Sequence, residues 1–594
     1  MMAVVFLAAG FPLSAFAQNS SPPDSARGAS FLPADAKNPN SSDAAFSGLA
    51  TAPPVSVLPT AQAPAANKTS DLIPAPVSAA PLPNVSPESI GLPSADGLGA
   101  DMWKGTSRPA AEHLLEIIAP TASPVLNTLA RRLLATAAVP PDGAASSAQK
   151  LTSERIEKLA AFGSGDEAWA LAKNADGALI DDVNFHRAAE AALLGNDKDL
   201  CGKAPEFAKA RATVDWQGIL IACQLRGGDT KAAQVALDVF RTQANRDNIF
   251  IGIADKNILG AGKMLPFQLT PLTPATLALL QIAKLPLPGA VYAHPDFALA
   301  PALLQIPAQQ GIAQLSLAER AAARGMIDSD ALAAVYRATN FNPEALASPL
   351  TSGESGLRLR ALLFRAAEGE KDSGKRIALA AKFVQSVSPD FLDGMGSVTA
   401  LMLGDIKADP SLAANAAIVA RIYVLAGRGD QALDWLRLAQ QNGGDSTDLL
   451  DLWPQFALAG LEAKDSYAAD FDKWLNAALK SADPVTVRDH VGATLLFLDA
   501  AGLNVPDTAW VKVLTTTHNE KPVAFSPLLC ERMREASAQG RRAETVLLAV
   551  AAAGEGDIPL PVAVGITRAL RLAGFKSEAA TFARQEVALL GKGG

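Results

Sequence analysis

The sequence predicts an all-α protein made of stacked helical hairpins, preceded by a long segment that forms no packed core. Hydrophobic residues make up 49% of the 594 residues but aromatic residues only 6%. Such a mixture favours helices packed through alanine and leucine, because strands prefer β-branched and aromatic residues. A second observation is the segment 409–441, which has the pattern of helix, glycine turn and helix. The third is an abrupt change of composition near residue 100.

The segment 409–441 shows why a hairpin is expected. Its first helix places apolar residues on one face, namely Leu412, Ala416, Val419 and Tyr423. The turn contains Gly427 and Gly429, which can adopt the left-handed conformation that ends a helix. In the second helix Ala432, Leu436 and Ala439 again share a face. Two such helices cannot bury both faces alone, so the hairpin requires stacked neighbours.

The pattern recurs along the chain. The spacing between the apolar and small residues of 409–441 is repeated in a second set: Trp216, Ile219, Cys223, Gly227, Ala232, Ala236 and Val239. Near the C-terminus, Gly540 and Gly574 lie 34 residues apart. The order of small and large residues resembles the tetratricopeptide repeat, whose period is about 34 residues. That resemblance implies a degenerate α-solenoid with structural turn glycines at Gly227, Gly427, Gly540 and Gly574. The proline that usually closes the repeat is replaced here by Gly443 and Gly444.

The first 17 residues are interpreted as a secretory signal peptide. An apolar run from residue 3 to residue 11 precedes Ala15-Phe16-Ala17, a small-x-small cleavage site. No lysine or arginine precedes the run, so either the signal is weak or translation starts further upstream. After cleavage we expect no membrane span, since no later apolar run approaches the ~18 residues that one requires.

Residues 18–100 are predicted to be a disordered linker rich in proline, alanine and serine. They hold 14 of the 40 prolines and only nine charged residues. Such a segment cannot bury enough apolar surface to offset its ordering entropy. Two interpretations remain open: a tether across the cell envelope, or a tolerated low-complexity insert.

Helices are expected in order from residue 101 onward. Ser107 followed by Pro109, and Ser123 followed by Pro124, mark the first two helix starts. Ser164 with Glu167, and Ser316 with Glu319, have the spacing of a capping box. We predict N-terminal repeats over 101–262, a proline-rich joint over 263–310 and C-terminal repeats over 311–594. The later helices are expected at 357–367, 374–387, 445–461, 469–480 and 485–500.

The three cysteines suggest one covalent link. Cys201 and Cys223 are 22 residues apart and could form a disulfide in an oxidising compartment, whereas Cys223 could also be a small core residue. Cys530 would then remain free.

Signals of chemistry are sparse in this sequence. The five histidines are scattered, and none has a histidine or cysteine four residues away, as a zinc site on a helix requires. No glycine-rich phosphate loop or nucleophile elbow is present. The formal charge of −8 argues against nucleic-acid binding, which needs a basic patch. We therefore expect no cofactor, no metal and no catalytic residues.

Glu354-Ser355 is the one dipeptide that suggests an enzyme. Lytic transglycosylases carry a catalytic Glu-Ser pair, and some place it after a periplasmic helical superhelix. The surrounding glycan-binding motifs of that family are missing here, and the dipeptide is better explained as the start of the helix containing Leu357.

The sequence thus favours a non-enzymatic periplasmic scaffold that binds an envelope protein or peptide through a helical-repeat surface, in a position close to peptidoglycan. The alternative is a peptidoglycan-active envelope enzyme with a helical superhelix.

Overall fold

The structure is a computed structural model that describes residues 86–590 apart from 94–95, 176, 212, 245, 260–271, 294–295, 310, 389–390, 444–446, 462–465, 481–483 and 515–526. The chain divides into two units, Met1–Ala79 and Ala80–Gly594, and every described residue belongs to the second. The predicted signal peptide and most of the predicted linker lie outside the described residues.

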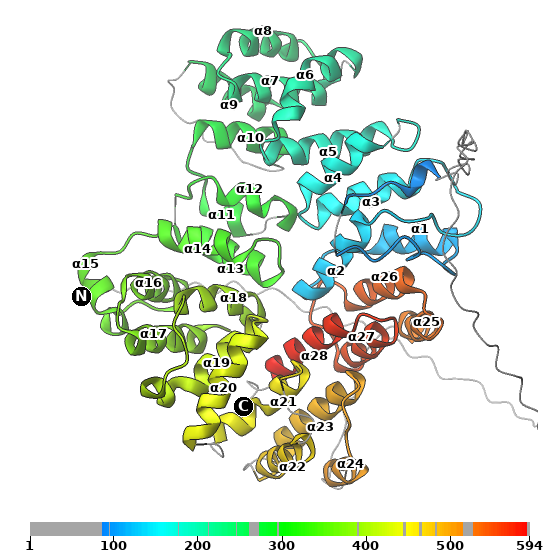
Figure 1. Cartoon of the computed structure of the whole chain (residues 1–594). Helices are drawn as coiled ribbons and strands as arrows, with labels where there is room; N and C mark the ends of the chain where they lie inside the picture. Colours follow the sequence, from blue (N-terminus) through cyan, green and yellow to red (C-terminus); the bar gives the residue numbers. More distant parts are fainter. Residues whose placement is uncertain are drawn as a thin grey trace, which may run out of the picture. The chain divides into compact units, whose positions relative to one another are not determined.

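The described residues form 28 α-helices and no strand, which confirms the all-α prediction (Figure 1). The first fourteen are α1 (Arg108–Ile117), α2 (Pro124–Ala135), α3 (Lys150–Ala161), α4 (Gly165–Asn174), α5 (Asp182–Leu194), α6 (Lys198–Arg211), α7 (Val214–Arg226), α8 (Thr230–Arg241), α9 (Asn248–Leu259), α10 (Pro274–Ala283), α11 (Gly289–Ala293), α12 (Ala300–Leu304), α13 (Gly311–Ala323) and α14 (Ser329–Ala338). The others are α15 (Pro343–Ala347), α16 (Gly356–Gly369), α17 (Ser373–Ser386), α18 (Leu392–Leu403), α19 (Ala416–Leu425), α20 (Gly429–Gly443), α21 (Thr447–Leu458), α22 (Tyr467–Ala478), α23 (Pro484–Ala500), α24 (Asp507–Leu514), α25 (Pro527–Ala538), α26 (Arg542–Ala553), α27 (Leu560–Leu572) and α28 (Lys576–Leu590). Among the 3-10 helices are η1 (Pro87–Ser89), η2 (Phe297–Leu299) and η5 (Pro410–Asn415).

One type of turn joins the two helices of most hairpins. At Gly427 (φ 70°) the glycine N–H donates to the Val424 carbonyl, and the next N–H, of Arg428, donates to the Tyr423 carbonyl. This is the Schellman pattern, in which a left-handed residue satisfies the last carbonyls of a helix. The same two bonds and a positive φ are found at Gly163, Asn196, Gly228, Gly325, Gly460, Gly502, Gly540 and Gly574.

The turn between α7 and α8 corrects one prediction. Gly227 ends α7 in the right-handed conformation with φ −75°, and the left-handed residue is Gly228 with φ 78°. The Schellman bonds therefore start one residue later than the alignment with Gly427 implied. The predicted glycines Gly427, Gly540 and Gly574 are all left-handed.

The hairpins stack through their first helices. Helix α3 contacts α5, α5 contacts α7 and α7 contacts α9; later, α19 contacts α21 and α21 contacts α23. Each hairpin thus buries a face that it cannot cover itself. The described structure is one of many stacked helices, compatible with a helical-repeat solenoid.

The first helices pack against the last ones. Helix α1 contacts α26, and α2 contacts both α26 and α28, which Figure 1 draws side by side. Arg132 of α2 forms an ion pair with Glu578 of α28 at 2.6 Å, and the N–H of Ala543 donates to the Met102 carbonyl. One hydrophobic core accordingly contains residues from 98 to 326 and from 453 to 587, while a second covers 315 to 456.

The packed part of the chain begins earlier than the predicted linker boundary at residue 100. Arg155, which is 2% exposed, donates to the carbonyls of Ile90, Leu134 and Thr136 at 2.9 Å each. Arg108 binds Glu88 with both terminal nitrogens at 2.8 Å. These two buried arginines hold the segment around η1 against α1, α2 and α3.

The proline-rich segment 263–310 does not divide the described chain. Its helix α10 packs against α5, α7 and α9, and α11 and α12 pack against α13. Leu277, Leu280 and Tyr292 are fully buried in the core shared with the first hairpins. The prolines here start helices and break them, as at Pro274.

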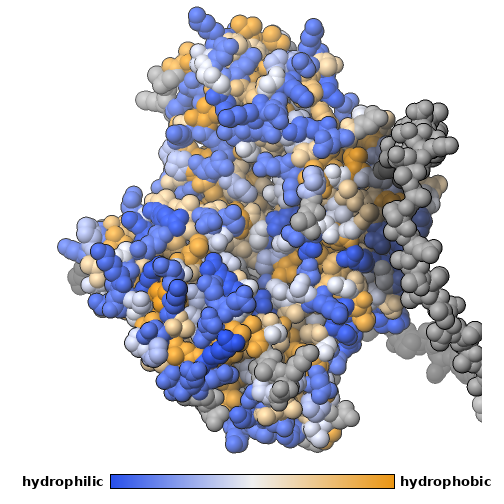
Figure 2. Space-filling model, in the orientation of Figure 1, coloured by the Kyte–Doolittle hydropathy of each residue, from blue (hydrophilic) through white to orange (hydrophobic). Residues whose placement is uncertain are grey.

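Exposed apolar side chains are dispersed over the described surface. The face drawn in Figure 2 interleaves hydrophilic and hydrophobic residues. The large exposed apolar residues lie on different elements, for example Val183 on α5, Val235 on α8 and Leu528 on α25. In the described part of the chain, no helix has both the length and the apolar character needed to span a bilayer.

Candidate functional site

A groove in the second half of the chain lies between α17, α19, α21, α22, α23 and α28, with a volume of about 730 Å³. Three consecutive hairpins line it with their first helices, α19, α21 and α23, and α17, α22 and α28 complete the walls. We call it the repeat groove, defined by Gln385, Ala417, Ile418, Arg421, Asp451, Leu452, Pro454, Gln455, Trp474, His490, Val491, Thr494, Val587 and Leu590. Its volume is within the range of natural ligand pockets.

Three helices present the same pattern to this groove. Each contributes a residue, its direct neighbour, and the residue four positions after the first: Ala417, Ile418 and Arg421 from α19; Asp451, Leu452 and Gln455 from α21; His490, Val491 and Thr494 from α23. Such positions share one helical face. The middle member is always aliphatic and the last is always polar. The groove therefore has an aliphatic row and a polar row running across three hairpins.

The polar row contains an unsatisfied amide oxygen. Gln455 is 6% exposed, and its buried Oε1 has no hydrogen-bond partner among the described residues. Thr494, in contrast, donates its hydroxyl to the His490 carbonyl at 2.8 Å. Leaving a buried polar atom unpaired costs about 1–3 kcal/mol, so such an atom calls for an explanation.

A proline leaves a main-chain carbonyl of the same helix without its usual donor. Pro454 lies inside α21 and lines the groove. Because proline has no N–H, the carbonyl of Leu450 cannot receive its usual helical hydrogen bond. Gln455 and this carbonyl both belong to the part of α21 beside the groove.

Aromatic rings support the groove from the side of α22. Trp453 and Trp474 are stacked with ring centroids 5.6 Å apart, and Phe471 meets both rings edge-on, at 5.6 and 5.8 Å. Trp474 is 5% exposed and lines the groove, so the cluster fixes the position of this wall.

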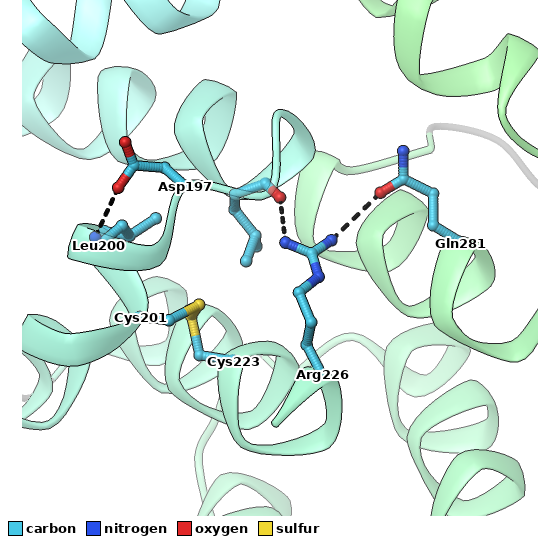
Figure 3. Close-up of a disulfide and its surroundings, with 7 residues drawn as sticks. Asp197, Leu200, Cys201, Cys223, Arg226 and Gln281 are labelled. Carbon is cyan, nitrogen blue, oxygen red and sulfur yellow. Dashed lines mark hydrogen bonds between the residues drawn. A yellow bond between two sulfur atoms is a disulfide. The ribbon is translucent and has the colours of Figure 1, made fainter. Parts of the chain in front are cut away.

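The predicted cysteine pair lies elsewhere, between α6 and α7. The sulfurs of Cys201 and Cys223 are bonded, with Cα atoms 5.1 Å apart (Figure 3). Nearby, Arg226 donates to Gln281 of α10 at 3.3 Å, and the N–H of Leu200 donates to Asp197 at 2.8 Å. These contacts tie the α6–α7 region to its neighbours. Cys530 is a free, partly buried thiol whose pKa is raised by burial, which disfavours the reactive thiolate.

Glu354 and Ser355 stand at the start of α16. Both oxygens of Glu354 bind Arg358, at 2.7 and 2.9 Å. These hydrogen bonds lower the pKa of Glu354, whereas a general acid in glycoside hydrolysis needs a raised one. The geometry does not favour this pair as a catalytic site.

The described histidines do not come together. His113 lies on α1, His186 on α5 and His490 on α23, while His294 and His518 lie outside the described residues. Within the described ranges no group of three or more histidine, cysteine or acidic side chains is arranged to hold a metal ion.

Comparison with known proteins gave no match: no family model, curated protein or solved structure is significantly similar to the chain.

The repeat groove was not predicted from the sequence, although a signal for it exists. The triplet in α21 follows that in α19 by 34 residues, and the triplet in α23 follows by a further 39. An alignment of first helices by these triplets would have grouped the lining residues. The repeat pattern predicted from the sequence is based on glycine and alanine positions. These positions reflect how the two helices of one hairpin pack together, and they do not indicate which residues line a groove between hairpins.

Proposed function

We propose that the chain is a non-enzymatic scaffold of degenerate tetratricopeptide-like hairpins, forming an α-solenoid, that is exported to the periplasm and binds a segment of an envelope protein in the repeat groove. The observation that supports this most is the triplet repeated on α19, α21 and α23, which presents an aliphatic row beside a polar row. Stacked hairpins commonly use such a continuous surface for recognition.

The chemistry of the groove suits an extended peptide segment. The aliphatic row of Ile418, Leu452 and Val491 offers apolar contacts to side chains of the segment. The side-chain oxygen of Gln455 offers an acceptor for a main-chain N–H group of the segment. An extended chain exposes N–H groups and side chains at regular intervals of about 3.3–3.6 Å per residue, which a helical ligand does not.

Site-specific photocrosslinking tests this proposal. A photoreactive residue at Ile418 should give one stoichiometric adduct in a periplasmic extract, and the same group at Gln440, an exposed position on α20, should not. Ala417→Phe narrows the groove and should abolish the adduct, while Gln440→Phe should leave it intact. The absence of any adduct at Ile418, or equal adducts at both positions, would contradict the proposal.

The remaining parts of the proposal need separate measurements. Cell fractionation against a periplasmic marker tests export, and sequencing of the mature N-terminus tests cleavage before Gln18. Cleavage of cell-wall glycan by the purified chain would favour the enzymatic alternative.

A further inference from the structure

A second cavity, remote from the repeat groove in sequence, lies between α4, α5 and α6. It has a volume of about 330 Å³. Its lining combines aromatic rings with three cations and one carboxylate: Phe185, Phe207, Lys173, Lys203, Arg211 and Asp182.

One face of α6 brings two of these cations to the two sides of a ring. Lys203, Phe207 and Arg211 are spaced four residues apart and therefore share a helical face. Eight residues of helix span about 12 Å, and Arg211 leans back along the helix over the ring of Phe207, while Lys203 lines the same cavity further toward the N-terminus. The helix is held in place by the Cys201–Cys223 bond to α7.

The guanidinium of Arg211 is fixed by aromatic rings. Its centre lies 4.8 Å from the ring centroid of Phe185, 5.7 Å from that of Phe207 and 5.4 Å from that of Trp216. Rings attract the flat face of a guanidinium, so its N–H groups remain available at the edge. Nε donates to Asp182 at 3.1 Å.

Two groups in this cavity keep free N–H donors, although Arg211 forms an ion pair with Asp182 through Nε. Among the described residues, the terminal nitrogens of Arg211 make no hydrogen bond and Lys203 makes no ion pair. Lys173 differs, because it forms ion pairs with Asp199 at 3.3 Å and Asp197 at 4.0 Å. A planar fork of free N–H groups, in the same cavity as a second cation, suits a carboxylate.

We propose that this cavity binds a carboxylate attached to an apolar or aromatic group. The carboxylate takes the terminal N–H groups of Arg211 and the ammonium of Lys203, and the apolar group lies against Phe185 and Phe207. The ligand is either a free small carboxylate or the C-terminal residue of a peptide, since both present the same chemistry. The inference is independent of the proposed function, because it involves none of the residues of the repeat groove.

Calorimetric titration of the full chain tests the site. The probes are 3-phenylpropionate, its neutral analogue 3-phenylpropanol, inorganic phosphate, and a short peptide ending in phenylalanine with a free or an amidated C-terminus. We expect saturable binding of phenylpropionate and roughly tenfold weaker binding of the alcohol and of phosphate. Tighter binding of the free peptide than of phenylpropionate, lost on amidation, would identify the peptide C-terminus as the source. The reverse order would identify a small molecule.

Variants on α6 separate recognition from folding. Arg211→Gln and Lys203→Gln should each weaken binding by about tenfold. Lys209→Gln, on the same helix but outside the cavity, is the matched control and should have no effect. Arg211→Lys keeps the charge but loses the fork, so it should fall between wild type and Arg211→Gln. The proposal would be overturned if no carboxylate bound saturably at about 10 mM, a concentration well above the range of specific affinities. It would also be overturned if Lys209→Gln weakened binding as much as Arg211→Gln.

Discussion

The region α5–α8 and the region α19–α22 use the same hairpin turn but fill the surface between helices differently. Gly228 and Gly427 both close their hairpins in the left-handed conformation. In α5–α8 the rings of Phe185, Phe207 and Trp216 and a disulfide occupy the space between successive helices. In α19–α22 the corresponding space is the repeat groove. The turn thus determines the hairpin, and the side chains that face the next hairpin decide how much open space remains, about 330 Å³ in the first region and about 730 Å³ in the second.

The two regions also differ in how their stability is distributed. The α5–α8 region relies on a few large contacts, including one covalent bond. The α19–α20 hairpin relies on close approach of small residues, since Ala416, Ala420 and Ala432 are fully buried. Perturbations of single groups should therefore remain local and differ between the regions.

Removing the disulfide should have the largest effect. The chain-entropy model gives about 3 kcal/mol for a loop of this length. In the Cys201→Ser/Cys223→Ser variant, amide hydrogen exchange in α6 and α7 should accelerate by about 100-fold, while exchange in α19–α21 stays unchanged. Mass analysis of unreduced peptides first checks that the bond is present in the purified chain. Unchanged protection of α6 and α7 would contradict the role assigned to the bond.

A buried carboxylate makes α5 sensitive to pH. Burial, reinforced by the charge of Asp215, raises the pKa of Glu190 to about 7. The folded state therefore holds this proton more tightly than the unfolded state, and the resulting stability is lost as the pH rises from about 4.5 through 7. Glu190→Gln should stabilise the protein by about 2 kcal/mol at pH 8 and have little effect at pH 4.

Chemical denaturation at pH 4, 6 and 8 measures this effect. Two neighbours complicate the wild-type profile: the pKa of His186 is lowered by burial, which acts in the opposite direction, and Arg187 favours the charged carboxylate. The difference between Glu190→Gln and wild type reports the titration of Glu190 together with its coupling to His186, whose Nδ1 lies 3.8 Å from the carboxylate. An equal gain at all three pH values would show that Glu190 does not titrate in this range.

Local features of the fold could be predicted from the sequence because short-range rules determine them. Ser107 and Ser123 precede α1 and α2 as predicted, and the expected helix at 485–500 corresponds to α23. The predictions failed where the role of a residue is determined by a contact with a residue far away in the sequence. Glu319 has the spacing of a capping box with Ser316, yet both lie inside α13, and Glu319 binds Arg360 and Tyr336 in the core.

The boundary of the folded part and the groove required long-range information. Glu88 and Ile90 belong to a segment of linker-like composition, but Arg108 and Arg155 bind them. The contact of α2 with α28 joins Arg132 to Glu578, residues that no local pattern relates. The groove likewise results from α19, α21, α23 and α28 meeting in space, and only its triplets are visible in the sequence.

Substitution of Gln455 should separate stability from binding. Gln455→Leu removes an unpaired buried amide oxygen at nearly constant volume and should stabilise the protein by about 1.5 kcal/mol. The same change should weaken the adduct formed from Ile418 if the groove binds a main chain. Thr494→Val is the comparison, because it removes a satisfied hydroxyl and should not stabilise. Destabilisation by Gln455→Leu would mean that the amide has a partner.

Substitution of the turn glycines should give the smallest effects and test the register of the hairpins. A left-handed residue other than glycine costs about 1 kcal/mol, so Gly228→Ala and Gly427→Ala should each destabilise by that amount. Neither added methyl group meets another atom within 4 Å, so the loss arises from the backbone alone. Gly227→Ala, one residue earlier and right-handed, should be neutral or slightly stabilising. Equilibrium unfolding of the three variants measures these changes in stability. A loss of stability in Gly227→Ala with none in Gly228→Ala would restore the register in which Gly227 corresponds to Gly427. In that register a different set of residues would face the next hairpin.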